Sequence, residues 1–222
     1  MRRIWMGVAI AMLLAMPVRA AEEKLVALTF DDGPSGRFTR RLLTGLEERD
    51  AKATFFLCGY RLELYPELAE RILAEGHEIG LHGYSHDSMA QMCACQLEDE
   101  LENTMKLLPD GCRPVFLRPP GGQATEETSR VAESWGLSIL YWSLDPKDWE
   151  IHDAGKITQR VVSRAVDGDV ILMHDLSDNS VDAALAIVDI LKERGFRFVT
   201  ASELAAAKDI ELKPGENYTK LQ

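Results

Sequence analysis

The sequence has 222 residues, of which 46% are hydrophobic and 27% are charged, and a chain of this size and composition can bury one substantial hydrophobic core. Its 36 acidic residues outnumber its 25 basic residues, so that the formal net charge is −11 at pH 7. This excess of negative charge argues against nucleic acid and against an anionic lipid surface as partners.

Residues 1–20 have the composition of a secretory signal peptide. Arg2 and Arg3 precede an apolar run over residues 4–16, and the segment ends in the small residue Ala20. Because this run is too short to span a membrane comfortably, we expect cleavage after Ala20 and no stable membrane insertion afterwards; an uncleaved anchor is the alternative. The exported protein would be periplasmic or secreted, with 22 basic and 36 acidic residues and a formal charge of −14.

The rest of the chain alternates between strand-like and helix-like segments, which is typical of an α/β protein with parallel strands. Apolar runs that predict strands occupy residues 25–30, 53–57, 77–81, 115–117, 137–142, 169–173 and 196–200. Helical periodicity occupies residues 38–48, 66–75, 92–108, 125–134, 154–166 and 181–194, and a short helix is expected at 202–207. The pattern predicts a single domain over residues 21–207, either a small (β/α) barrel or a doubly wound sheet, followed by a loosely attached polar tail over 208–222.

Polar clusters follow five of the predicted strands, at the ends where active sites of such folds gather. Asp31 and Asp32 follow the first strand on a Gly-Pro turn, where both carboxylates can point into one site. One carboxylate of such a pair can bind a metal ion while the other takes a proton from water. Alone, the pair could equally be an ordinary acidic turn.

His82 and His86 follow the third strand, four residues apart. On one helical turn this spacing brings both imidazoles onto one face, within reach of a single cation. Taken alone, such a pair is usually a matter of packing. Two histidines and one carboxylate from the Asp31–Asp32 turn would make an open metal site, and zinc is the first choice for these ligand types.

The sequence Arg118-Pro119-Pro120-Gly121-Gly122 ends the fourth strand in a stiff turn. The backbone of Gly121 can approach a ligand closely, so that its N–H could donate to an oxyanion. Arg118 could orient a carboxylate and keep it ionised. The alternative for Arg118 is a structural ion pair.

Asp145 and Asp148 follow the fifth strand, and His174 follows the sixth. His174 could protonate a leaving amine if a carboxylate held its other ring nitrogen, and Asp148 is the candidate for that carboxylate. Trp149 and Leu172 would then form an apolar pocket for a methyl group. Trp149 could instead be a core residue.

Four cysteines remain after the signal segment: Cys58, Cys93, Cys95 and Cys112. An oxidising compartment permits disulfides, but the sequence does not choose among the three full pairings. A straight helix before Cys112 would hold it more than ~20 Å from Cys93 and Cys95, so a bridge from Cys58 to Cys93 or Cys95 is the easier one. A zinc site at Cys93 and Cys95 is disfavoured, because common zinc motifs have a two-residue gap.

In chain order, these clusters resemble the five motifs of the polysaccharide deacetylases, carbohydrate esterase family 4. The motifs here are Thr29-Phe30-Asp31-Asp32-Gly33-Pro34, His82-Gly83-Tyr84-Ser85-His86, Arg118-Pro119-Pro120-Gly121, residues 145–149 and Leu172-Met173-His174. The resemblance covers nearly all of the chain after the signal segment. It implies a distorted (β/α) barrel with about seven parallel strands.

The resemblance also implies a divalent metal ion, most often Zn²⁺ with Co²⁺ or Ni²⁺ as alternatives, held by Asp32, His82 and His86. Asp31 would be the general base and His174 the general acid.

By the same resemblance, Arg118 would orient the base and Asp148 would support the acid. The family usually has a tyrosine where this chain has Gly121, which implies a wider acetyl pocket.

The function implied is removal of N-acetyl groups from an amino-sugar polysaccharide or oligosaccharide such as peptidoglycan, a chitin-like polymer or an exopolysaccharide, with release of acetate. An O-acetyl esterase would use the same residues, and a cyclic-amide hydrolase is a more distant alternative. A catalytically silent carbohydrate-binding domain would be expected to lack some of these residues.

Overall fold

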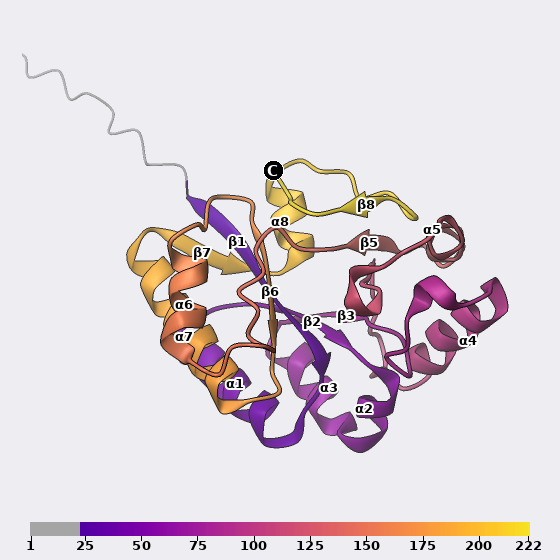
Figure 1. Ribbon diagram of the computed structural model, residues 1–222, viewed down its shortest axis with the longest axis horizontal. Coiled ribbons are helices and arrows are strands. Elements are labelled where there is room, and N and C mark those ends of the chain that lie inside the picture. Colours follow the sequence, from indigo (N-terminus) through magenta and orange to yellow (C-terminus); the bar gives the residue numbers. More distant parts are fainter. Residues whose placement is uncertain (1–22) are drawn as a thin grey trace, which may run out of the picture.

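The computed structural model, which describes residues 23–222, contains one curved sheet of parallel strands (Figure 1). The order of neighbouring strands is β6-β1-β2-β3-β4-β5-β8, and β7 also pairs with β1. The strands are β1 (Lys24–Gly33), β2 (Thr54–Leu57), β3 (Glu78–Leu81), β4 (Phe116–Leu117), β5 (Ser138–Leu140), β6 (Val170–His174), β7 (Phe196–Val199) and β8 (Asn217–Tyr218).

The two ends of this sheet approach each other. Directly after β5, Leu144 forms a parallel bridge with Ile171 of β6, and the N–H of Leu172 donates to the carbonyl of Leu144 at 2.9 Å. The sheet therefore curls into a distorted (β/α) barrel, and the predicted fold class is confirmed.

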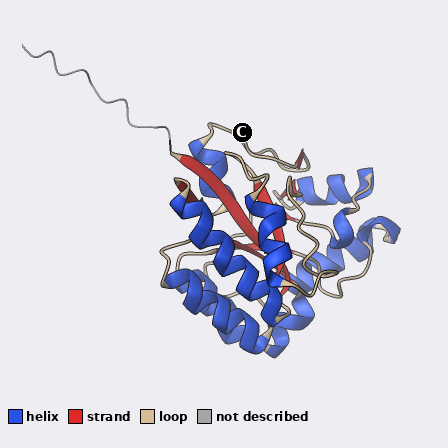
Figure 2. Cartoon of the chain, turned by 60° about the vertical axis from the view of Figure 1, so that its left-hand side comes forward, coloured by secondary structure: helices blue, strands red, loops and turns tan. Residues whose placement is uncertain are grey.

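The helices lie around the outside of the strands (Figure 2). Each predicted helix is present, with ends shifted by a few residues, and α2 and two short 3₁₀ helices are additional. The helices are α1 (Gly36–Glu47), α2 (Gly59–Leu64), α3 (Pro66–Ala74), η1 (Met89–Gln91), α4 (Ala94–Met105), η2 (Pro120–Gly122), α5 (Glu126–Ser134), α6 (Ala154–Val162), α7 (Asp178–Glu193) and α8 (Ala201–Ala207).

Strand β1 is buried on both faces, as expected for a central parallel strand. Val26, Leu28 and Phe30 belong to one large apolar cluster together with residues of α1 and α7. Leu25 and Ala27 point to the opposite face and belong to a second cluster. Since side chains alternate along a strand, the face of Leu25 and Ala27 is also the face of residues 29 and 31.

The C-terminal tail is not loosely attached, so that part of the prediction is wrong. Asn217 and Tyr218 form β8, which pairs in parallel with β5. Further along, Leu221 is fully buried, and its N–H donates to the carbonyl of Gly168 at 3.1 Å. The apolar side chains of the tail cover one end of the second cluster, which explains why a polar segment packs here.

The expected disulfide from Cys58 to Cys93 or Cys95 is absent, and all four cysteines are free. Cys58 is buried, with its Sγ 3.9 Å from the carbonyl oxygen of His82, whereas Cys93 and Cys95 are exposed. Cys58, the buried N-cap of α2, is therefore not paired with the exposed thiols of Cys93 or Cys95.

The predicted signal peptide, residues 1–20, lies outside the described residues. Among residues 23–222, the helices are all too short or too polar to cross a membrane.

Candidate active site

Asp31 and Asp32 both reach one cavity because the backbone turns sharply between them. Asp31 lies on the inner face of β1, and an extended strand would send Asp32 to the opposite face. Asp32 instead has φ 69°, in the left-handed region that non-glycine residues rarely adopt. Such strain is typical of functional sites, and here it brings the second carboxylate back beside the first.

Asp32 faces two imidazoles. The Nδ1 atom of His82 is 2.6 Å from the carbonyl oxygen of Arg118, and because a carbonyl only accepts, this nitrogen carries the proton. The Nε2 atom of His82 then carries no proton and presents a lone pair. It lies 3.2 Å from Asp32 Oδ1. His86 Nε2 lies 2.9 Å from the same oxygen.

Two acceptors that face each other repel unless a cation lies between them, and this arrangement therefore fits a metal ion. Asp32 Oδ1 is buried and has no hydrogen-bond partner. The ligand atoms of Asp32, His82 and His86 all lie within 4.8 Å of one another. His82 is buried while the His86 side chain is 41% exposed, so that one side of the cluster is open, as a catalytic metal site requires.

The charges of the cluster keep Asp32 ionised. Burial by itself raises the pKa of Asp32, but the imidazoles of His82 and His86 outweigh it and hold this pKa well below its usual range. The Asp32 carboxylate in turn raises the pKa of His86. The Asp32 carboxylate is therefore ionised at neutral pH.

His82 and His86 meet through a loop and not through the helical turn that their spacing suggested. His86 has φ 67°, which turns its ring back so that the two ring centroids are 5.2 Å apart. Glu100 of α4 holds this loop, because its Oε2 accepts from the N–H groups of Tyr84 at 2.6 Å and Ser85 at 2.9 Å.

Arg118 holds Asp31 from behind. Its Nη1 donates to Asp31 Oδ1 at 2.7 Å and to Thr29 Oγ1 at 2.8 Å. Its other donors are satisfied by the carbonyls of Leu140 and Tyr141, each at 2.8 Å. Because the guanidinium is fully buried, it provides a fixed positive charge that orients the Asp31 carboxylate.

His174 and Asp148 form a second pair on the same side of the barrel. The backbone N–H of His174 and its ring Nδ1 each lie 2.8 Å from an oxygen of the buried Asp148 carboxylate. Burial lowers the pKa of His174, but Asp148, together with Asp31 and Asp32, raises it to about 9. These carboxylates favour the protonated form of His174, with Nδ1 held by Asp148 and Nε2 left for a substrate.

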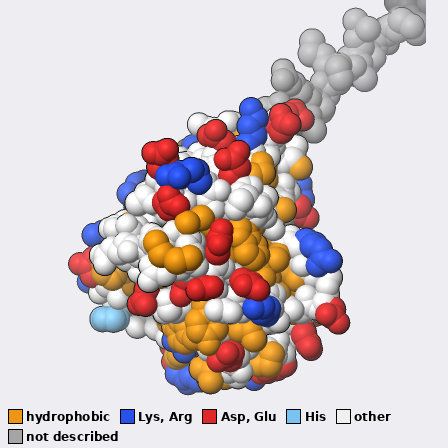
Figure 3. All heavy atoms as spheres, turned by 90° about the vertical axis from the view of Figure 1, so that its right-hand side faces the viewer, with side chains coloured by type: hydrophobic (Ala, Val, Ile, Leu, Met, Phe, Trp, Pro, Cys, Tyr) orange, Lys and Arg blue, Asp and Glu red, His pale blue; other side chains and the backbone are white. Residues whose placement is uncertain are grey.

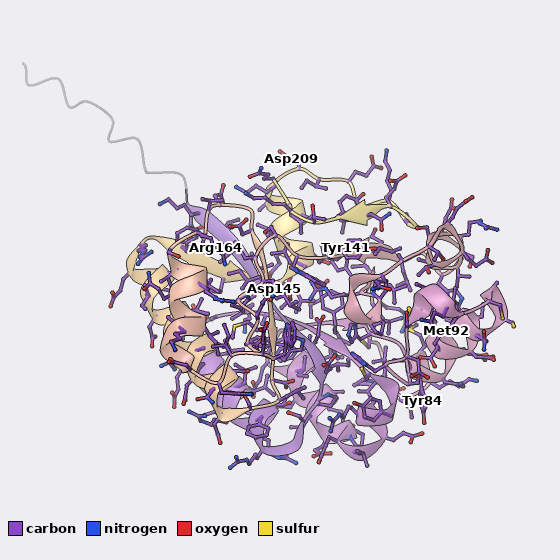
Figure 4. The ribbon with its side chains drawn as sticks, in the orientation of Figure 1. Tyr84, Met92, Tyr141, Asp145, Arg164 and Asp209 are labelled. Carbon is purple, nitrogen blue, oxygen red and sulfur yellow. The ribbon has the colours of Figure 1, made fainter. Side chains whose placement is uncertain are left out.

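The pairing of β1 with β6 brings the two functional pairs together, since Asp31 is the register partner of His174. Asp31 and His174 line a cavity of about 370 Å³. Asp145, which also lines it, is labelled near the centre of Figure 4. The lining comprises Asp31, Asp32, His82, His86, Gly121, Trp142, Asp145, Trp149, Leu172 and His174. Arg118 and Asp148 lie behind it.

Leu172 and Trp149, the two apolar residues named from the sequence, both line this cavity. Leu172 is 4% exposed and Trp149 is 59% exposed, so that Leu172 forms a wall and Trp149 stands at the mouth instead of in the core. Gly121 and His86 also line a neighbouring hollow of about 370 Å³, together with Ser88 and Gln123.

No role was assigned from the sequence to two further residues, one in the cavity and one buried beside it. Trp142 lines the cavity, and its only signal was its place at the end of the fifth predicted strand. Asp175 is fully buried directly after His174, and it accepts from the hydroxyl of Thr39. Burial raises the pKa of Asp175 to about 6, and its contact with Thr39 ties the end of β6 to α1.

The arrangement has known relatives. A family model described as polysaccharide deacetylase matches residues 19–140. The peptidoglycan-N-acetylglucosamine deacetylase PgdA of Listeria monocytogenes is 36% identical over 202 residues, which are 90% of this chain and 42% of that protein. This chain therefore spans less than half the length of that relative.

Two solved structures have the same fold. The peptidoglycan deacetylase PdaC from Bacillus subtilis is 35% identical with a TM-score of 0.81, and the match covers 85% of this chain and 93% of that one. A family 4 acetyl xylan esterase from Clostridium thermocellum, in complex with a cobalt ion, is 32% identical with a TM-score of 0.83, covering 89% of this chain and 99% of that one.

Proposed function

Because the chain belongs to the polysaccharide deacetylase family, we propose that it is a metal-dependent hydrolase that removes N-acetyl groups from an amino-sugar glycan and releases acetate. The names of the similar proteins from Listeria and Bacillus favour peptidoglycan as the substrate class. The observation that carries the proposal is the cavity that Asp31 and His174 share with the cluster of three potential metal ligands. Arg118 supports Asp31, and Asp148 supports His174.

Asp32, His82 and His86 would hold the metal ion. Their two imidazoles and one carboxylate suit Zn²⁺ first, with Co²⁺ or Ni²⁺ as alternatives. When bound, such a cation supplies a Lewis acid that activates water and polarises a carbonyl oxygen.

Asp31 would act as the general base. Its Oδ1 is held by Arg118 at 2.7 Å, so that Oδ2 is the oxygen left to take a proton from the attacking water. His174 would protonate the departing amine through Nε2, because Asp148 holds Nδ1 at 2.8 Å. The N–H of Gly121, which also lines the cavity, would donate to the oxyanion.

The shape of the site favours a polymer as substrate. Leu172 and Trp149 offer apolar contacts for the acetyl methyl group. The neighbouring hollow shares His86 and Gly121 with the cavity, and a Cβ built at Gly121 meets no atom within 4 Å. A sugar chain could therefore cross this point without obstruction and occupy both hollows.

Export to the periplasm or the cell exterior follows from the same proposal, since peptidoglycan lies outside the cytoplasmic membrane. The acidic composition, with a formal net charge of −11, gives no support to a nucleic-acid partner.

The test is acetate release from N-acetylglucosamine oligomers and from peptidoglycan by zinc-loaded protein, with metal analysis of each variant. Asp31→Asn should retain the metal and lose about 10²-fold to 10⁴-fold in rate, while Asp32→Asn should lose the metal. His174→Ala should lose activity, whereas His152→Ala, at an exposed histidine outside the cavity, should not.

An assay on acetylated xylan, run in parallel, tests the esterase alternative. Xylan is the substrate chosen because the cobalt-bound relative is an acetyl xylan esterase. Acetate release from the ester, with no acetate release from the amide substrates, would replace the proposed activity by O-deacetylation. Unchanged rates in both Asp31→Asn and His174→Ala would overturn the mechanism.

A further inference from the structure

A pair of thiols lies outside the candidate active site, at the start of α4. Cys93 is the N-cap of this helix, and Cys95 is its second residue. Both side chains are exposed, and their Sγ atoms are 2.8 Å apart. Met92, labelled beside α4 in Figure 4, directly precedes the pair.

The backbone at this point suits a disulfide. Because Ala94 between them is helical, the Cα atoms of Cys93 and Cys95 are about 5.4 Å apart from helix geometry. That separation is within the range of disulfides, roughly 4.4–6.8 Å. The 2.8 Å sulfur contact is too short for two ligands of one tetrahedral metal ion, each of which needs a bond of about 2.3 Å at a wide angle.

The two thiols are not equivalent. The side chain of Cys95 lowers the pKa of Cys93, and the backbone at the start of α4 acts in the same direction. The pKa of Cys95 is raised, first by the same contact with Cys93. Because Cys93 is the N-cap of α4, it lies at the end of the helix that stabilises a thiolate. Cys93 is therefore the attacking thiolate and Cys95 the resolving thiol.

The other two cysteines have the opposite environment. Cys58 and Cys112 are buried. Burial raises the pKa of Cys112 to about 11 and that of Cys58 further still. They are expected to be inert, and they serve as internal controls.

We propose that Cys93 and Cys95 form a redox-active dithiol that exchanges with external disulfides. The Cys93 thiolate attacks a disulfide RSSR and forms a mixed disulfide, releasing one thiolate RS⁻. The Cys95 thiolate then attacks Cys93 Sγ, forms the Cys93–Cys95 bond and releases the second RS⁻. The protein loses two electrons and two protons, and RSSR becomes two RSH.

The acidic surroundings of the pair favour a positively charged external disulfide. Acidic residues fill α4 after the pair, with no basic residue within the helix: Glu98, Asp99, Glu100 and Glu102. The face with α4 and α5 carries more acidic than basic side chains (Figure 3). A cationic disulfide should therefore approach more readily than an anionic one.

The test uses the full chain after reduction, exposed without oxygen to cystamine, a dication, or to dithiodiglycolate, a dianion of similar size. Free thiols are then alkylated and the protein is digested. Trypsin cuts after Arg71 and Lys106, so that Cys93 and Cys95 share the peptide 72–106, and Cys58 and Cys112 fall on others.

In the wild type, the peptide 72–106 should carry an internal disulfide, formed faster with cystamine and with a charge preference that shrinks at high salt. Cys95→Ser should stop at a mixed disulfide on Cys93. Cys93→Ser should react more slowly than Cys95→Ser, by about threefold for each pKa unit between the thiols, since thiolate fraction and nucleophilicity oppose each other.

Mixed disulfides on both residues without the internal bond would overturn the proposal, and so would equal reaction rates for the two serine variants. A soft metal ion that copurifies with the wild type, and is lost when either cysteine is replaced by serine, would also overturn it. The readout does not involve deacetylase activity, so that its failure and the failure of the proposed function are distinguishable.

Discussion

The buried ion pair between Arg118 and Asp31 gives a sharp energetic prediction for Arg118→Met. Methionine keeps most of the length and apolar surface of arginine but removes its charge and its donors. The change leaves the Asp31 carboxylate, whose Oδ1 was 2.7 Å from Nη1, and the carbonyl of Leu140 without these partners. Breaking a buried pair in this way costs about 3–5 kcal/mol, which is a large part of the roughly 5–15 kcal/mol that stabilises a typical domain.

A double-mutant cycle separates the pair from the other contacts of Arg118. Asp31→Asn alone leaves a buried guanidinium facing a neutral amide, and it should also destabilise the protein. The combination of Asp31→Asn with Arg118→Met leaves neither charge uncompensated. The two single losses in unfolding free energy should therefore add up to at least about 1.5 kcal/mol more than the loss in the double variant.

The assay is urea unfolding at pH 7 in a metal chelator, so that metal binding does not change the apparent stability. Arg130→Met is the matched control, because Arg130 is 61% exposed and pairs with Glu127 at 2.7 Å; it should cost less than about 1 kcal/mol. The reasoning fails if Arg118→Met costs no more than this control, or if the cycle is additive.

Three further changes test other parts of the structure. Asp148→Asn should lower kcat by about 10²-fold or more with little change in KM, because the His174 ring loses the carboxylate at 2.8 Å that holds Nδ1; unchanged kcat in steady-state assays would contradict this role. Burial, with Lys52 and Arg71, lowers the pKa of His77 from 6.5 to about 4, so folding keeps the imidazole neutral. The contribution of His77 to the free energy of unfolding is complete above pH 6.5 and falls by about 2–3 kcal/mol between pH 7.5 and 4.5. Urea unfolding of His77→Asn should lack this fall; the same pH dependence in the variant and the wild type would refute the prediction. Gly122→Ala should destabilise the protein by more than about 1 kcal/mol, because Gly122 has φ 68° and an added Cβ would lie 2.7 Å from the Trp142 ring; unfolding midpoints that coincide would show that the turn relaxes.

Much of the fold and site was determined by short stretches of sequence. Alternation of apolar segments with helical periodicity gave the parallel strands and most helices, because both signals depend on residues only a few positions apart. The clusters around Asp31, His82, Arg118 and His174 could be placed at strand ends, and parallel strands bring such ends to one rim.

The tertiary structure decided how these clusters meet. The pairing of Asp31 with His174 depends on the register between β1 and β6, which lie more than 100 residues apart in the sequence. The loop that turns His86 toward Asp32 depends on Glu100 of α4, and not on the helical spacing of the histidines.

Where the sequence predictions failed, the cause was a long-range contact. The tail looked polar, yet pairing of β8 with β5 and burial of Leu221 attach it to the barrel. The sequence favoured a disulfide from Cys58 to Cys93 or Cys95, yet Cys58 is buried whereas the thiols at the start of α4 are exposed. Local sequence determines which side chains a strand or helix presents, whereas strand register and burial, which involve distant segments, decide which of them come into contact.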